Sequence, residues 1–71
     1  MKKYTYDVDL HFPDGWDTYL VKAECIDSAR YAAVMRVINE ISREKAETID
    51  AIRVYKHGTD NLLKEFGIFS K

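Results

Sequence analysis

Residues 26–45 read IDSARYAAVMRVINEISREK and form the longest stretch with helical periodicity in the chain. At 3.6 residues per turn, five apolar side chains share one arc and polar side chains occupy the opposite side. The arc consists of Tyr31, Val34, Met35, Ile38 and Ile41, with Val37 at its flank. Asp27 or Ser28 is expected to cap the first turn, and the helix is expected to end between residues 43 and 46. The pattern predicts an amphipathic helix that lies against a sheet.

Two strand-like segments precede this helix. From residue 3 to residue 12 apolar and polar side chains alternate without a break, which is typical of a half-buried strand. A turn sequence, Pro13-Asp14-Gly15-Trp16, follows. Residues 17–26 then form the return strand, so the first two strands are predicted to be a hairpin.

The register of this hairpin follows from matching apolar side chains across the two strands. Pairing Phe12 with Asp17 places apolar residues opposite one another along the helix-facing side, as far as Tyr4 and Cys25. The same register sets Asp7 opposite Lys22 on the other side, which is a favourable pair of charges. We therefore expect a four-residue loop with Trp16 on it.

Two further strands are expected after the helix, over residues 47–57 and 62–69, joined by the turn Gly58-Thr59-Asp60-Asn61. Two registers are open for this second hairpin. One pairs Val54 with Phe66 and Ile52 with Ile68, and the other pairs Arg53 with Glu65. The first gives an apolar inner face, and the second gives a cross-strand ion pair.

The resulting order is ββαββ, an α+β two-layer domain that spans residues 1–71. A right-handed crossover through the helix favours the antiparallel strand order 2-1-3-4, with the cleanest strand in the centre. The alternative order is 1-2-3-4, with the second and third strands parallel. In both arrangements a single helix covers one face of the sheet and leaves the other face open.

Composition narrows the function classes. The 71 residues carry 11 basic and 12 acidic side chains, a formal net charge of −1, which disfavours binding to a phosphate backbone. A single cysteine excludes an intrachain disulfide, and no Cys or His spacing suits a zinc site. Neither an apolar signal core nor a run of about 18 apolar residues is present. We expect a cytoplasmic protein without a membrane segment.

Several residues are of types that occur in catalytic or metal sites, but their spacing in this sequence does not match such a site. Asp7, Asp9 and His11 alternate on the outer side of the first strand and could turn two ligands toward a metal ion, although a solvated strand face explains them more simply. Cys25 is expected to face the core as a small buried hydrophobe. No phosphate loop, serine elbow or dinucleotide motif occurs. We therefore predict no catalytic, cofactor or metal site.

The open sheet face is predicted to carry apolar side chains with no place in the core. On the predicted strands these side chains leave an apolar, partly aromatic patch, which is typical of an interface. The alternative is that the last strand twists or that its parity differs by one residue. Together with the tryptophan of the first loop, the predicted partner-binding residues are Trp16, Leu20, Tyr55, Leu63 and Phe69.

The function that these features favour is protein binding without catalysis. The chain is expected to form a homodimer or to bind a larger target, as an accessory or inhibitor protein of a phage or other mobile element does. The alternative from another class is single-stranded nucleic-acid binding, in which exposed aromatic rings stack on bases and lysine or arginine side chains contact phosphates. The cationic residues available for that role are Lys22, Arg53, Lys56 and Lys64.

Overall fold

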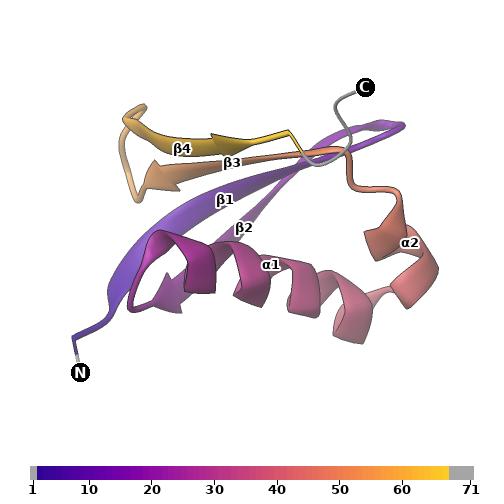
Figure 1. Ribbon diagram of the computed structural model, residues 1–71, viewed down its shortest axis with the longest axis horizontal. Coiled ribbons are helices and arrows are strands. Elements are labelled where there is room, and N and C mark those ends of the chain that lie inside the picture. The colour runs from indigo at the N-terminus through magenta and orange to yellow at the C-terminus, as the bar shows by residue number, and fades with distance from the viewer. Residues whose placement is uncertain (1, 68–71) are drawn as a thin grey trace.

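The computed structural model describes residues 2–67. Four antiparallel strands form one sheet of order β2-β1-β3-β4, and both helices lie on the same side of it (Figure 1). The elements are β1 (Tyr4–Phe12), β2 (Gly15–Ala23), α1 (Ile26–Glu40), α2 (Arg43–Glu47), β3 (Ala51–Lys56) and β4 (Leu62–Phe66). This arrangement confirms the predicted α+β class and the strand order 2-1-3-4, and it rules out the order 1-2-3-4.

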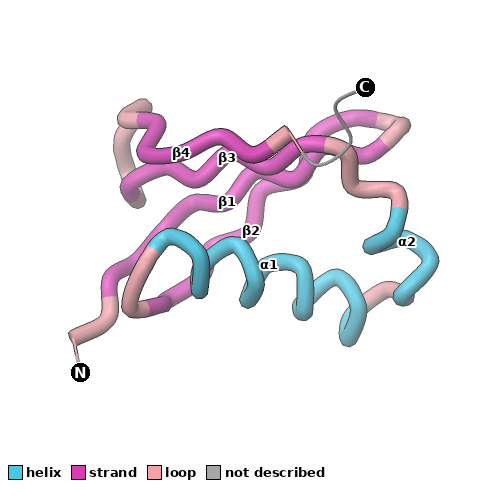
Figure 2. Tube along the Cα trace, in the orientation of Figure 1, coloured by secondary structure: helices cyan, strands magenta, loops and turns pink. Residues whose placement is uncertain are grey.

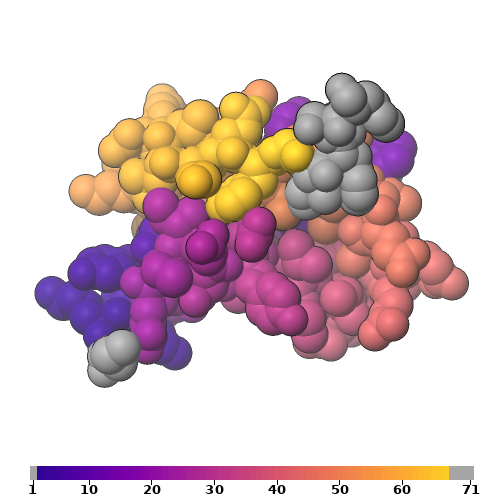
Figure 3. All heavy atoms as spheres, in the orientation of Figure 1, coloured from indigo at the N-terminus to yellow at the C-terminus, as the bar shows by residue number. Residues whose placement is uncertain are grey.

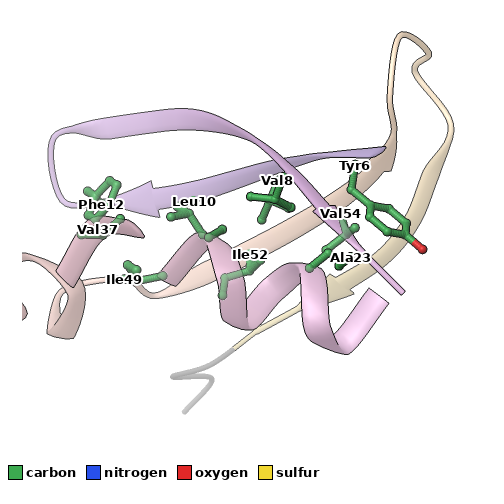
Figure 4. Packing of buried hydrophobic residues seen from close by; sticks show 12 residues of the cluster. Tyr6, Val8, Leu10, Phe12, Ala23, Val37, Ile49, Ile52 and Val54 are labelled. Atoms are coloured by element: carbon green, nitrogen blue, oxygen red, sulfur yellow. The ribbon is translucent and has the colours of Figure 1, made fainter. Parts of the chain in front are cut away.

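The central strand β1 supplies most of the sheet's contribution to the core. Its even-numbered side chains from Tyr6 to Phe12 are buried, and its odd-numbered ones lie on the opposite, partly exposed side. Because side chains alternate across a strand, one alternating sequence produces one buried and one wetted face. Ile52 and Val54 of β3 are fully buried beside β1, and Figure 4 shows these side chains turned toward α1.

The face that α1 turns toward the sheet differs from the predicted one. Ala29, Ala33 and Val37 are fully buried, whereas Tyr31 is 68% exposed and Ile41 is 55% exposed. The predicted arc is therefore wrong at Tyr31, Met35 and Ile41, whereas Val34 and the flanking Val37 do pack in the core. The core cluster also holds Phe12, Leu10 and Ile52 from the sheet. Small alanine side chains leave room for these large ones at the density of a packed interior.

The chain leaves α1 earlier than predicted. The helix ends at Glu40, and a separate short helix, α2, begins at Arg43. Ser42 caps α2 because its Oγ accepts a hydrogen bond of 3.0 Å from the backbone N–H of Lys45. At the other end, the N-cap of α1 is Cys25 rather than Asp27 or Ser28, and it makes no side-chain cap bond.

The third strand begins later than predicted because α2 occupies the preceding residues. β3 covers Ala51–Lys56 rather than residues 47–57. Between α2 and β3, Ile49 is 2% exposed and closes one end of the core (Figure 4).

The first hairpin has a tighter turn than predicted. Phe12 pairs with Gly15, so Pro13 and Asp14 alone form the loop (Figure 2). Gly15 has φ +135°, a conformation that residues with a side chain rarely adopt, and this allows β2 to start at once. The predicted pairing of Phe12 with Asp17 is thus wrong by two residues.

A shift of two residues keeps every side chain on its predicted face, because the side-chain period of a strand is two. It does change the partners. Tyr4 pairs with Ala23 instead of Cys25, and Lys22 pairs with Thr5 instead of Asp7.

The second hairpin adopts the register that pairs Arg53 with Glu65. Near the turn that joins β3 and β4 the register shifts, so that Tyr55 pairs with Leu62. The bulge gives β4 one extra residue, Leu63, relative to β3. The predicted strand over residues 62–69 is observed as far as Phe66, and residues 68–71 lie outside the described part of the chain.

Candidate functional site

The side of the sheet that the helices leave uncovered is the candidate site, and we call it the back face. Its side chains come from alternate positions of all four strands. Strand pairing places them in cross-strand rows, such as Trp16, His11 and Ala51 in one row and Leu20, Asp7 and Tyr55 in another. The back face consists of Thr5, Asp7, Asp9, His11, Trp16, Thr18, Leu20, Lys22, Ala51, Arg53, Tyr55, Leu62 and Glu65.

Trp16 lies on the back face and not on a loop, as a consequence of the tighter turn. Its ring lies 4.6 Å from the imidazole of His11, centroid to centroid, and the guanidinium carbon of Arg53 lies 4.6 Å from the ring centre. Despite these contacts Trp16 remains 43% exposed. The strands thus hold an aromatic ring in place and leave much of its surface to solvent.

Arg53 is fixed on its other side by β4. Its Nε donates to Oε2 of Glu65 at 3.0 Å, and this hydrogen bond raises the pKa of the guanidinium. Contact of a guanidinium with a tryptophan ring is an attractive cation–π interaction. Trp16, Arg53 and Glu65 therefore form a continuous line of side-chain contacts that crosses the sheet diagonally from β2 to β4, which we call the Trp16–Arg53 stack.

The acidic side chains of β1 bind to partners within the protein. Asp7 accepts hydrogen bonds from the imidazole of His57 at 2.9 Å and from the backbone N–H of Gly58 at 3.3 Å. The hydrogen bond from His57 lowers the pKa of Asp7 below its ordinary value, and the bond from Gly58 acts in the same direction. Asp9 accepts a bond of 2.7 Å from the hydroxyl of Thr18.

These contacts bear on the metal hypothesis for Asp7, Asp9 and His11. The third residue, His11, lies 2.6 Å from a carboxylate oxygen of Asp50, so the three side chains point to three separate partners. Within residues 2–67 no three His, Cys, Asp or Glu side chains are grouped so that they could hold a metal ion. An open hollow of about 290 Å³ lies beside β1, and its lining is polar: Asp7, Asp9, Thr18, Tyr55, Thr59 and Asp60.

The structure brings together three of the five predicted partner-binding residues. Trp16, Leu20 and Tyr55 share the back face, and Leu20 is 53% exposed. Asp7 lies between Leu20 and Tyr55 in their row. The apolar patch is therefore divided by a carboxylate and is less continuous than the sequence predicted.

The other two predicted residues, both in the last part of the chain, do not join this group. The bulge in β4 gives Leu62, not Leu63, the position opposite Tyr55. Leu63 instead lines a pocket of about 340 Å³ at the open end of the core, together with Tyr4 and Tyr6. Phe69 lies outside the described residues.

Sequence reasoning missed a second exposed apolar surface, on the outer side of α1. Tyr31 and Met35 of α1 are 68% and 37% exposed there, and Ile41, the C-cap residue, is 55% exposed. The signal that could have revealed it is the spacing of Ala29, Ala33 and Val37, a competing arc of small residues at helical period. Next to Tyr31, the guanidinium of Arg30 lies 4.4 Å above the ring of Phe66, and Figure 3 shows α1 and β4 in contact.

Cys25 is exposed, and the prediction that it faces the core is wrong. In the observed register it lies beyond the end of β2, at the start of α1. Its Sγ lies 3.4 Å from the hydroxyl oxygen of Ser28. Hydrogen bonding from the Ser28 side chain, and then from its backbone N–H, lowers the pKa of the thiol.

No described helix is both long enough and apolar enough to cross a membrane. Comparison of the chain with protein-family models, curated proteins and solved structures gives no match, so the site is interpreted from its own geometry.

Proposed function

We propose that this protein is a small, non-enzymatic binding module that recognises a protein surface through its back face. The observation that carries the proposal is the Trp16–Arg53 stack. Tryptophan and arginine are the residue types most enriched among those that dominate the energy of protein interfaces. Here one residue of each type lies in contact on an open sheet face, and Trp16 is 43% exposed.

The second support is the fixed geometry of the stack. Ordering a flexible side chain on binding costs about 0.5–1.5 kcal/mol. Arg53 is already held between Trp16 and Glu65, and Trp16 also contacts His11. Because these side chains are in place before a partner arrives, less of that cost remains to be met on binding.

Single-stranded nucleic-acid binding is the alternative from another class. Trp16 and Arg53 are residue types that stack on bases. Against it, Asp7, Asp9 and Asp60 line the hollow on the same face, and the net charge is −1. Carboxylates repel a phosphate backbone, so the electrostatics of the back face favour a protein partner.

We further propose a cytoplasmic setting and an accessory or inhibitory role of the kind that phages and other mobile elements encode. The support is compositional: 71 residues, a nearly neutral charge and a single cysteine. Cytoplasmic proteins keep their thiols reduced, which suits an unpaired and exposed cysteine.

Affinity capture from a lysate of the source cells tests the binding role. The bait proteins are wild type, Trp16→Ala, and Tyr31→Ala as the matched control, which removes an exposed aromatic ring from α1 instead. We expect a target that wild type and Tyr31→Ala retain and that Trp16→Ala loses, with thermal melts showing that all three are folded. A set of captured proteins that is the same for all three baits contradicts the proposal, as does loss by Tyr31→Ala alone.

A further inference from the structure

The pocket of about 340 Å³ at the open end of the core lies where β1 begins and β3 ends. An apolar cavity of about 150 Å³ is enough to hold a benzene molecule. This pocket therefore has room for one ring with a short chain attached, and its volume falls at the lower end of the range for small-molecule sites. It is lined by Tyr4, Thr5, Tyr6, Lys56, His57 and Leu63.

The side chain of Tyr6 brings an unpaired hydrogen-bonding group to this pocket. Tyr6 is only 7% exposed, and within residues 2–67 its hydroxyl makes no hydrogen bond. The oxygen is not sealed in the core, because it keeps access to the pocket that Tyr6 lines. Figure 4 shows it turned away from Leu10 and Phe12. Since the hydroxyl of a buried tyrosine usually has a partner, this one is placed to bond a ligand.

Lys56 supplies a positive charge beside this hydroxyl. It pairs directly with Tyr6 between β1 and β3, so the two side chains leave the sheet on the same side, with their Cβ atoms about 4.5–5.5 Å apart. In the described chain no ion pair joins Lys56 to a carboxylate, and no acidic side chain lines the pocket. A hydroxyl and an ammonium are both donors, and together they suit a carboxylate on the ligand.

The remaining walls of the pocket are mainly apolar and are already in position. Tyr4 and Leu63 are 51% and 38% exposed, and the bulge in β4 places Leu63 here. The ring of His57 is held by its contact of 2.9 Å with Asp7. A ligand with an apolar body gains free energy by covering exposed apolar side chains of this kind.

We infer that this pocket is a second binding site, for a small carboxylic acid with one aromatic or aliphatic body. The carboxylate accepts hydrogen bonds from the hydroxyl of Tyr6 and the ammonium of Lys56, and the body lies against Tyr4 and Leu63. None of the residues of the Trp16–Arg53 stack lines this pocket. The site therefore adds a small ligand to the proposed function and does not depend on the protein partner of the back face.

An NMR titration of the whole chain with phenylacetate tests the site. We expect saturable shifts of the backbone signals of Tyr6, Lys56 and Leu63, with a dissociation constant on the order of 1 mM for a ligand of this size. Phenethyl alcohol keeps the ring without the charge, and phenethylamine reverses the charge. Both should bind at least about fivefold more weakly than phenylacetate.

Two substitutions test the contacts with the carboxylate. Tyr6→Phe removes a hydroxyl that no described residue binds, so the fold is retained, and it should weaken phenylacetate binding about tenfold. Its matched control is Tyr19→Phe, outside the pocket, which should change nothing. Lys56→Met keeps the apolar stem without the charge and should weaken binding about threefold, whereas Lys64→Met, on β4, should not.

Three results would overturn the inference. The first is the lack of saturable shifts at about 10 mM phenylacetate. The second is equal affinity for phenylacetate and phenethyl alcohol, or an unchanged affinity in Tyr6→Phe. The third is tighter binding of N-acetylphenylalanine, which resembles the end of a protein chain and would assign the pocket to a chain terminus instead of a small acid.

The two sites of the protein can be tested separately. Trp16→Ala should lose the captured target and bind phenylacetate as wild type does, and Tyr6→Phe should do the reverse. Loss of phenylacetate binding in Trp16→Ala would overturn the separation of the two sites.

Discussion

Replacing Val37 by alanine tests which face of α1 holds the fold together. Val37 is fully buried in the core, and the substitution removes two carbon atoms. At about 0.8 kcal/mol per buried carbon, with a further term for the cavity left behind, the free energy of unfolding should fall by about 2 kcal/mol. A domain of 71 residues has about 4–10 kcal/mol in total, so the variant remains folded.

The matched control is Tyr31→Ala, which removes more atoms from the same helix. Because Tyr31 is 68% exposed, we expect a change within about 0.5 kcal/mol. On the arc that helical periodicity alone suggests, Tyr31 would be buried, and its truncation would cost about 3–5 kcal/mol. The two variants therefore distinguish the observed orientation of α1 from the alternative one.

Urea denaturation followed by far-UV circular dichroism measures both effects, with equal m-values as the check that the unfolded states are comparable. In thermal melts the loss for Val37→Ala corresponds to a fall in Tm of roughly 8–16 °C. A larger loss for Tyr31→Ala than for Val37→Ala would refute the packing of α1 described above.

Three further predictions concern the turn and the polar contacts. Gly15→Ala should lower the stability by about 1–3 kcal/mol in urea denaturation, because φ is +135° there although no atom obstructs a Cβ. His57→Ala should lower Tm at about pH 6 but not at about pH 2. The contact with His57 lowers the pKa of Asp7, so the ionised carboxylate stabilises the folded protein above the ordinary carboxyl pKa. This stabilisation is lost as the pH falls through the lowered pKa of Asp7. An equal difference in Tm between wild type and His57→Ala at both pH values would refute this prediction. Ser28→Ala should raise the pKa of Cys25 and slow its alkylation by iodoacetamide at about pH 7.5; an unchanged rate would refute the contact.

The sequence predicted the fold because alternation and chain order constrain it strongly. The unbroken alternation of β1 identifies its buried face, and a strand shifted by two residues retains that face. The strand order and the face of β2 that carries Leu20 were therefore predictable even though the register was not, whereas Trp16 was expected on the loop and lies in β2. The register depended on the backbone of Gly15, whose φ of +135° begins β2 two residues earlier than a four-residue loop would.

The orientation of α1 could not be predicted from its own pattern, since apolar residues occur around most of its circumference. Tyr31 and Ile41 form one arc and Ala29, Ala33 and Val37 another, and the choice between them depends on the volume of the sheet side chains beneath. Periodicity favours the larger residues, whereas packing here selects the smaller ones.

The contacts that build the candidate site join residues that are far apart in the chain, and they could not be predicted from the sequence either. Arg53 meets Trp16 and His57 meets Asp7 across 37 and 50 positions of the chain. Such pairs depend on strand order, register and the shape of the β3–β4 turn together. Residue type alone identified Trp16 as a candidate, and the structure supplies its neighbours.

The most direct test of binding through the back face is an NMR titration of the protein with the target that affinity capture identifies. We expect the side-chain N–H signals of Trp16 and Arg53 to shift as the target is added, because these two groups are in contact on the open sheet face. The backbone signals of Tyr31 and Met35, on the exposed side of α1, should stay in place. Shifts confined to α1, with the Trp16 and Arg53 signals unchanged, would contradict binding through the back face.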